Sequence, residues 1–88
     1  MESLYTAMPV IFRYDGYRFF FFSNEGNPLE LCHVHVRKGG AIAKFWVTPE
    51  IKLAESYGLT STELRKLHTL IHDNKPLIEE KWHEYFKT

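Results

Sequence analysis

The chain has 88 residues, a formal net charge of zero and one cysteine. A chain of this length forms one small domain, and its 44% hydrophobic and 16% aromatic content excludes a disordered tail. The single cysteine excludes an internal disulfide framework, and no apolar run is long enough to span a membrane. Because no basic region followed by an apolar stretch opens the chain, we expect a cytoplasmic protein without a membrane partner.

The first seven residues, MESLYTA, show no periodicity, so we expect a flexible arm over 1–7 and a single α+β domain over 8–88. The next segment, PVIFRYDGYRFFFF, holds Asp15-Gly16 between two β-prone runs. Asp-Gly suits a type I′ turn, which needs positive φ at both central residues. The turn predicts a hairpin whose pairs run from Tyr14–Tyr17 to Ile11–Phe20. Alternation then predicts a core face of Val10, Phe12, Tyr14, Tyr17, Phe19 and Phe21, and an opposite face of Ile11, Arg13, Arg18, Phe20 and Phe22.

A loop around residues 26–28 separates this hairpin from a second one, HVHVRKGGAIAKFWV, at residues 33–47. A turn at Gly39-Gly40 pairs His35 with Lys44 and His33 with Trp46. A three-residue loop would shift the partners, but alternate residues would still share a face. One face is then apolar throughout, with Val34, Val36, Ala43, Phe45 and Val47. The other carries His33, His35, Arg37, Ile42, Lys44 and Trp46.

The segment TPEIKLAESYG at 48–58 is interpreted as a connector, with a short helical turn after Pro49. Thr60 and Glu63 then have the spacing of a capping box, which predicts the start of a helix. Asn74-Lys75-Pro76 breaks or kinks this helix, and PLIEEKWHEYFK continues it. The apolar positions predicted to face the core are Leu64, Leu67, Ile71, Ile78, Trp82, Tyr85 and Phe86.

Two hairpins followed by helical segments predict an α+β fold, an antiparallel sheet with one or two C-terminal helices packed on one face. The apolar helix stripes would cover the apolar side of the sheet and leave its other side open. In the predicted register no acidic residue lies on that side. The side is therefore expected to be basic although the net charge of the whole chain is zero. Its residues are Arg13, Arg18, His33, His35, Arg37, Lys44 and Trp46.

Four segments carry a resemblance to a known family: MPVIFRYDGYRFFFFSNEGNP, HVHVRKGG, AKFW and KWHEYF. Together they resemble a family of small bacterial domains of unknown function that commonly shows a Pro-Pro-His-[Ile/Val]-His-Val motif. Leu31-Cys32 stands where the family has its two prolines. The resemblance covers nearly everything from Met8 onward. It implies a toxin–antitoxin module in which a small protein encoded nearby is the partner, and it carries over no catalytic residues.

The His-Val-His pair is the main candidate site. His33 and His35 would lie on one face, roughly 7 Å apart at the backbone, with room for a phosphate between them. One neutral imidazole could take a proton while one imidazolium gives one, and neighbouring cations would stabilise a phosphoryl oxygen. This arrangement predicts a toxin-type component acting on RNA or another phosphate-bearing ligand, as a metal-independent ribonuclease. Its phosphate- or nucleic-acid-binding residues would be Arg13, Arg18, Arg37, Lys44 and Trp46.

Other interpretations of the same face remain open. It could be the contact surface of a non-catalytic partner-binding or DNA-associated subunit of the module. The aromatic residues Trp46, Phe20 and Phe22 fit base stacking, but exposed aromatic residues on a small sheet more often mark an interface with a partner or a second copy. We expect no metal and no cofactor, because a zinc site needs three or four ligands and only two converge. Cys32 alternates onto the opposite face, where it fits a small buried apolar residue.

Overall fold

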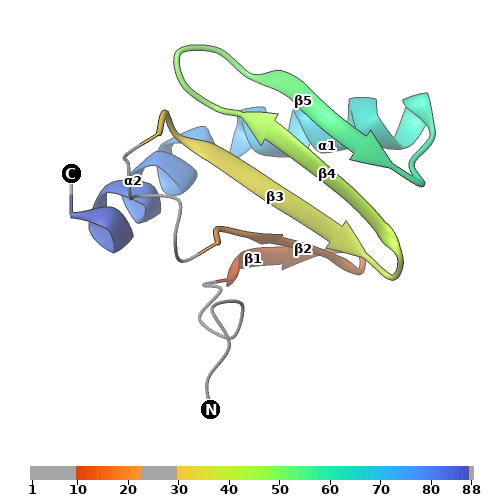
Figure 1. Cartoon of the computed structure of the whole chain (residues 1–88), viewed down its shortest axis with the longest axis horizontal. Helices are drawn as coiled ribbons and strands as arrows, with labels where there is room; N and C mark the ends of the chain where they lie inside the picture. Colours follow the sequence, from red (N-terminus) through yellow and green to blue (C-terminus); the bar gives the residue numbers. More distant parts are fainter. Residues whose placement is uncertain (1–9, 23–29, 88) are drawn as a thin grey trace.

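The computed structural model describes residues 10–22 and 30–87, so the arm expected at 1–7 and the loop at 26–28 lie outside the described residues. Five antiparallel strands form one sheet in the order of the sequence, and two helices follow them (Figure 1). The predicted α+β class is confirmed. The elements are β1 (Val10–Tyr14), β2 (Tyr17–Phe20), β3 (His33–Lys38), β4 (Ala41–Trp46), β5 (Lys52–Tyr57), α1 (Ser61–Asp73) and α2 (Lys75–Phe86).

The β1–β2 hairpin turns at Asp15-Gly16 as predicted, with φ of 51° and 83° at these two residues. Its first three pairs are confirmed, from Tyr14–Tyr17 to Phe12–Phe19. The predicted Ile11–Phe20 pair is wrong, because an irregularity between Val10 and Phe12 places Val10 opposite Phe20. Two residues expected in the core are instead partly exposed, namely Val10 at 39% and Tyr14 at 48%.

The β3–β4 hairpin has the register predicted from its Gly-Gly turn. His33 pairs with Trp46, His35 with Lys44, and Arg37 with Ile42. The apolar face is buried as predicted, with Val34, Val36, Ala43, Phe45 and Val47 all in the core. Because the position of the turn was predicted correctly, the predicted pairing of these two strands is also correct.

The interpretation of 48–58 as a connector is wrong, because residues 52–57 form β5 at the edge of the sheet. This strand pairs with β4 and brings Glu55 opposite Lys44 and Tyr57 opposite Ile42. All six of its residues are exposed. An edge strand exposed on both faces needs no alternation of apolar and polar residues, so the sequence lacks the usual strand signal.

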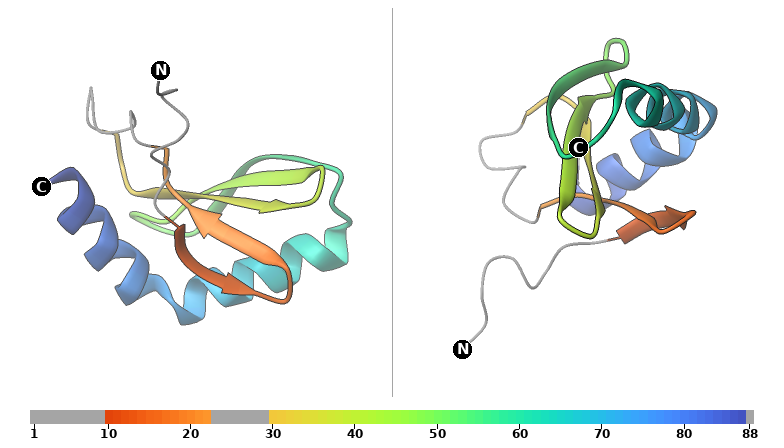
Figure 2. Two further views of the ribbon diagram at one scale, coloured as in Figure 1. Left: turned by 90° about the horizontal axis from the view of Figure 1, so that it is seen from below. Right: turned by 90° about the vertical axis from the view of Figure 1, so that its right-hand side faces the viewer.

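The two helices cover one face of the sheet, as both views in Figure 2 show. The predicted capping box is present: Glu63 N–H donates to Thr60 Oγ1 at 3.1 Å, and Thr60 N–H donates to Glu63 Oε1 at 2.8 Å. The break is also confirmed, since α1 ends and α2 begins around Asn74. Tyr85 was expected in the core but is 39% exposed. The helix residues that enter the core are Leu67, Ile71, Ile78 and Trp82.

Two polar contacts join the β1–β2 hairpin to α1. Lys66 Nζ lies 3.1 Å from Asp15 Oδ2, and the Tyr17 hydroxyl donates to Glu63 Oε2 at 3.1 Å. Burial raises the pKa of Tyr17, and the hydrogen bond from its hydroxyl to the Glu63 carboxylate raises it further. Both contacts therefore link the first hairpin to the first turns of α1. Within the described residues, neither helix is long and apolar enough to cross a membrane.

Candidate functional site

The face of the sheet opposite the helices, which we call the open face, carries three arginines side by side. Arg13 on β1 lies directly opposite Arg18 on β2, and Arg18 lies directly opposite Arg37 on β3. All three side chains are exposed. Adjacent strands lie about 4.8 Å apart, so three positive charges are held in a line across neighbouring strands. We call these three residues the arginine row.

Like charges directly opposite each other destabilise a sheet unless something neutralises them. Within residues 10–22 and 30–87, no salt bridge joins the arginine row to a carboxylate. The acidic residues that do form ion pairs in this part of the chain are paired elsewhere, for example Asp15 with Lys66. The arginine row is therefore a concentration of positive charge suited to an anionic ligand.

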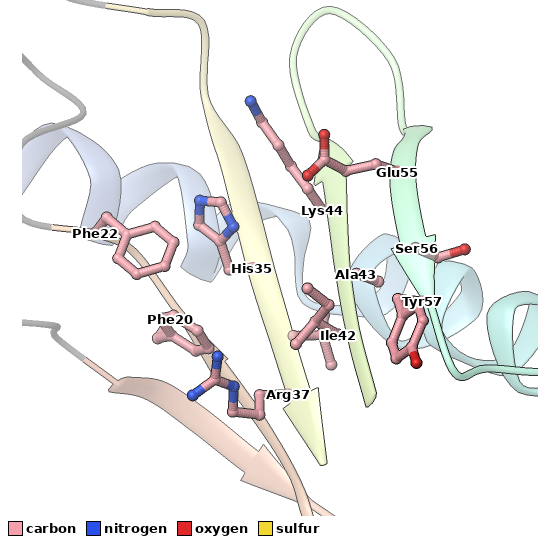
Figure 3. A pocket seen from close by; sticks show the side chains of 11 residues that line it. Phe20, Phe22, His35, Arg37, Ile42, Ala43, Lys44, Glu55, Ser56 and Tyr57 are labelled. Carbon is pink, nitrogen blue, oxygen red and sulfur yellow. The ribbon is translucent and has the colours of Figure 1, made fainter. Parts of the chain in front are cut away.

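A pocket of about 210 Å³ lies where the same line of residues continues across the sheet. Arg37 is opposite Ile42, and Ile42 is opposite Tyr57, so the line passes from the arginines onto apolar and aromatic side chains. Figure 3 shows these residues around the pocket, with Arg37 near one end and Lys44 near the other. The lining residues are Phe20, Phe22, His35, Val36, Arg37, Ile42, Ala43, Lys44, Glu55, Ser56 and Tyr57.

His35 lies at the side of this pocket, on the sheet face where the strand alternation placed it. Its half-buried ring lies 4.4 Å from the ring of Phe22 and 5.7 Å from that of Phe20, centroid to centroid. Lys44 is directly opposite His35 on β4. Its ammonium lies 4.6 Å from the centroid of the Trp46 ring, in a cation–π contact. His35 is thus positioned between aromatic rings and two cations, Arg37 and Lys44.

His33 was expected to be exposed beside His35, and this is wrong: His33 is fully buried. The two rings are close, with centroids 5.3 Å apart, but His33 is enclosed by Trp46 at 5.2 Å and by Trp82 of α2 at 5.1 Å. Its Nδ1 lies 2.9 Å from the Leu31 carbonyl oxygen, to which an Nδ1–H would donate. The last residue of β3 that pairs with β2 is His35. His33, two residues earlier in β3, packs against Trp82 of α2 instead. His33 therefore cannot contact a ligand on the open face in this conformation.

The aromatic residues of the open face divide into two groups. Phe20 is only 4% exposed, so the interpretation of it as a base-stacking platform is wrong. Phe22 and Trp46 are half-buried and each keeps accessible surface. Tyr57, which the sequence interpretation missed along with the rest of β5, is 73% exposed and lines the pocket.

One acidic residue does lie on the open face, contrary to expectation. Glu55 of β5 is opposite Lys44 and lines the pocket. It was missed because β5 itself was interpreted as a connector. The signal that could have identified the strand is weak: KLAESY is followed by Gly58, whose φ of 78° ends the strand. Glu55 makes no salt bridge within the part of the chain that the structure describes.

Cys32 is buried on the helix side, as predicted. Burial, assisted by the nearby Glu79 carboxylate, raises the pKa of its thiol to about 12. The thiol is therefore protonated near neutral pH and is a poor nucleophile. Among the described residues there is no group of three or more His, Cys, Asp or Glu side chains placed to hold a metal ion. The expectation that the protein binds no metal stays a prediction.

Comparison with known proteins gives one match. The family described as Domain of unknown function (DUF4160) matches residues 16–83. No curated protein and no solved structure matches the chain. The matched span contains β2 to β5, α1, most of α2 and every residue that lines the pocket. Because it covers most of the chain, the protein belongs to the DUF4160 family, a domain of unknown function.

Proposed function

We propose that the open face binds single-stranded RNA through its phosphates, as the toxin-type component of a two-protein module. The observation that carries the proposal is the arginine row, in which Arg18 has an arginine directly opposite it on each side. A ligand with closely repeated negative charges offsets the repulsion among these side chains. A guanidinium group also presents a planar fork of donors that matches phosphate oxygens.

The continuation of the arginine row into the pocket supports a nucleic acid rather than an inorganic anion. A polynucleotide combines a charged backbone with planar rings. The open face combines three arginines with a pocket whose walls include His35 and Tyr57. Single strands are favoured over duplexes because only unpaired bases can leave the backbone and stack on protein side chains.

The proposal assigns proton transfer, if the bound RNA is cleaved, to His35. His35 lines the pocket, and an imidazole ring has one nitrogen that can accept a proton and one that can donate it. Arg37, at the end of the pocket that joins the arginine row, would stabilise negative charge on a phosphoryl oxygen, and Lys44 adds positive charge at the other end (Figure 3). Buried His33 supports the ring of His35 by direct contact instead of exchanging protons with the ligand. Ribonuclease activity and toxicity stay predictions, and RNA binding does not depend on them.

A second candidate is the non-catalytic subunit that binds a partner protein. The observation that favours it is apolar exposure beside the arginines, with Ile42 at 39% and Tyr57 at 73%. An acidic amphipathic segment of a small cognate protein would fit both features. In a toxin–antitoxin module the two candidates are compatible, because a partner that covers the RNA-binding face would inhibit it.

Binding of a labelled single-stranded RNA, measured by fluorescence anisotropy over a range of salt concentrations, tests the proposal. Arg18→Ala and Arg37→Ala should each weaken binding and reduce the log–log salt slope by about one. Arg65→Ala is the matched control, because Arg65 is exposed on α1, on the other side of the sheet. It removes the same charge and should leave the slope unchanged.

Two results would contradict the proposal. One is the absence of RNA binding at low salt. The other is an equal loss of binding in the Arg65→Ala control, which would indicate general electrostatic attraction to the protein. Competition between labelled RNA and a poly-glutamate peptide of the same total charge distinguishes RNA binding from the binding of an acidic protein partner. Displacement of RNA by the acidic peptide as efficiently as by unlabelled RNA would favour a protein partner.

A further inference from the structure

The pocket has the size and the walls of a site for one planar ring. Its volume of about 210 Å³ is below the range of roughly 300–1,000 Å³ that accommodates drug-sized ligands. His35 and Phe22 form one side, Tyr57 lies on the other, and Ile42 lies between them (Figure 3). Arg37 lies where the pocket meets the arginine row, so a base in the pocket would have its own phosphate beside a guanidinium group.

Glu55 is the feature of this pocket that phosphate binding does not explain. Its carboxylate extends from β5 toward β4, at the same end of the pocket as Lys44 (Figure 3). The Lys44 ammonium lies over the Trp46 ring, 4.6 Å from its centroid. Among the described residues Glu55 has no ion pair. A carboxylate on a face that attracts a polyanion weakens binding unless it makes a specific contact with the ligand.

A carboxylate accepts hydrogen bonds and donates none, so it selects ligands by their donors. Guanine presents an N1–H and an amino group side by side on its pairing edge, and both can donate to the two oxygens of one carboxylate. Uracil has a single N–H between two carbonyl oxygens. Adenine and cytosine each place an acceptor nitrogen beside their amino group. Guanine is therefore the base whose donors match Glu55 best.

We propose that the pocket binds a guanine base of the RNA, with Glu55 accepting hydrogen bonds from N1–H and the amino group. The base lies between His35 and Tyr57, and its phosphate contacts Arg37. This inference rests on the proposed function, because the arginine row must hold the strand that delivers the base. It adds a sequence preference that phosphate contacts alone cannot give.

The test compares four single-stranded RNAs of equal length, one all-uridine and three with a single central guanosine, adenosine or cytidine. Affinities are measured by anisotropy at one low salt concentration. The wild type should prefer the guanosine strand by about 5- to 150-fold, the range for one bidentate base contact. Glu55→Gln should lose this preference and should bind the all-uridine strand at least as well as the wild type does. Glu84→Gln, an exposed residue of α2, removes the same charge and should keep the preference.

The outcomes separate the two proposals. Equal affinity of the wild type for all four strands, with salt-dependent binding retained, would overturn guanine recognition and leave RNA binding intact. A guanine preference that survives Glu55→Gln would overturn the role of Glu55. No binding to any strand would overturn both proposals. Because Glu55 is exposed, the variant should remain folded, and thermal unfolding monitored by circular dichroism checks this.

Discussion

Arg18 lies directly opposite Arg37 on the neighbouring antiparallel strand, and its other neighbour in the sheet is Arg13. Sheets are stabilised by complementary cross-strand pairs, and two successive like-charged pairs have the opposite effect. The chain therefore maintains an unfavourable arrangement on its open face while its helix-facing side is apolar and well packed. This contrast supports the proposal that the arginines bind an anionic ligand, because they do not stabilise the sheet.

The repulsion should be measurable in the free protein. Arg18→Gln should increase the free energy of unfolding by about 0.2–1 kcal/mol at low salt, because it removes two like-charge contacts. The gain should shrink as salt screens the remaining charges. Urea unfolding at two ionic strengths measures both effects, with Arg65→Gln as the control for charge. If Arg18→Gln destabilised the protein at low salt, the arginines would contribute packing that outweighs their repulsion.

The two histidines should differ in their effect on stability. His33→Ala should cost about 2–4 kcal/mol, because it removes a fully buried ring packed against Trp46 and Trp82. His35→Ala removes a half-buried ring and should cost less than about 1 kcal/mol. Val34→Ala, with a predicted cost of about 1–3 kcal/mol, calibrates the core. Chemical denaturation of the three variants checks the order, and equal costs for both histidines would contradict the assignment of His33 to the interior.

The contact between the first hairpin and α1 should depend on pH. The pKa of Glu63 lies below its ordinary value of 4.5, because the backbone N–H of Thr60 and the Tyr17 hydroxyl donate to its carboxylate. A lowered pKa means that the folded state binds the proton less readily than the unfolded state does. The stabilisation is therefore complete above pH 4.5 and is lost as the pH falls through the lower, folded-state pKa.

Glu63→Gln should remove part of this acid sensitivity, and thermal unfolding between pH 3 and pH 7 measures it. Tyr17→Phe deletes the hydroxyl that donates to Glu63 and should cost about 0.5–1.5 kcal/mol near neutral pH. An unchanged pH profile in Glu63→Gln would show that the acid sensitivity arises elsewhere, for instance at Asp15, whose pKa is lowered by Lys66.

Cys32 should be unreactive in the folded protein. Its thiol is buried and has a pKa of about 12, so very little thiolate is present near neutral pH. Iodoacetamide at pH 8 should modify the native protein far more slowly than the same protein in urea. Mass spectrometry over time measures the two rates. Rapid modification under native conditions would place Cys32 in an accessible environment.

Much of the fold could be predicted from short local patterns of residues. Asp15-Gly16 and Gly39-Gly40 set the registers of two hairpins, and these turns placed the arginine row and His35 correctly on one face. The Thr60–Glu63 capping box located the start of α1. Each of these features is determined by residues close together in the chain, which is why sequence reasoning could find them.

The features that escaped prediction depend on contacts between distant segments. His33 is buried because Trp82, almost fifty residues later, packs against its ring. β5 has no pattern of its own, since all six of its residues are exposed and pairing with β4 defines it. Because β5 was not predicted, the predicted site lacked Glu55 and Tyr57, which form the β5 side of the pocket. The basic half of the site was therefore predictable, and the pocket was not.

The most direct test of RNA binding at the open face is a titration of the ¹⁵N-labelled protein with single-stranded RNA, followed by amide and arginine side-chain NMR signals. If RNA binds the open face, the perturbed signals should cluster on Arg18, Arg37, Ile42 and Tyr57, while those of Arg65 on α1 should stay unchanged. Perturbations confined to the helices, or no perturbation at low salt, would contradict RNA binding at this face.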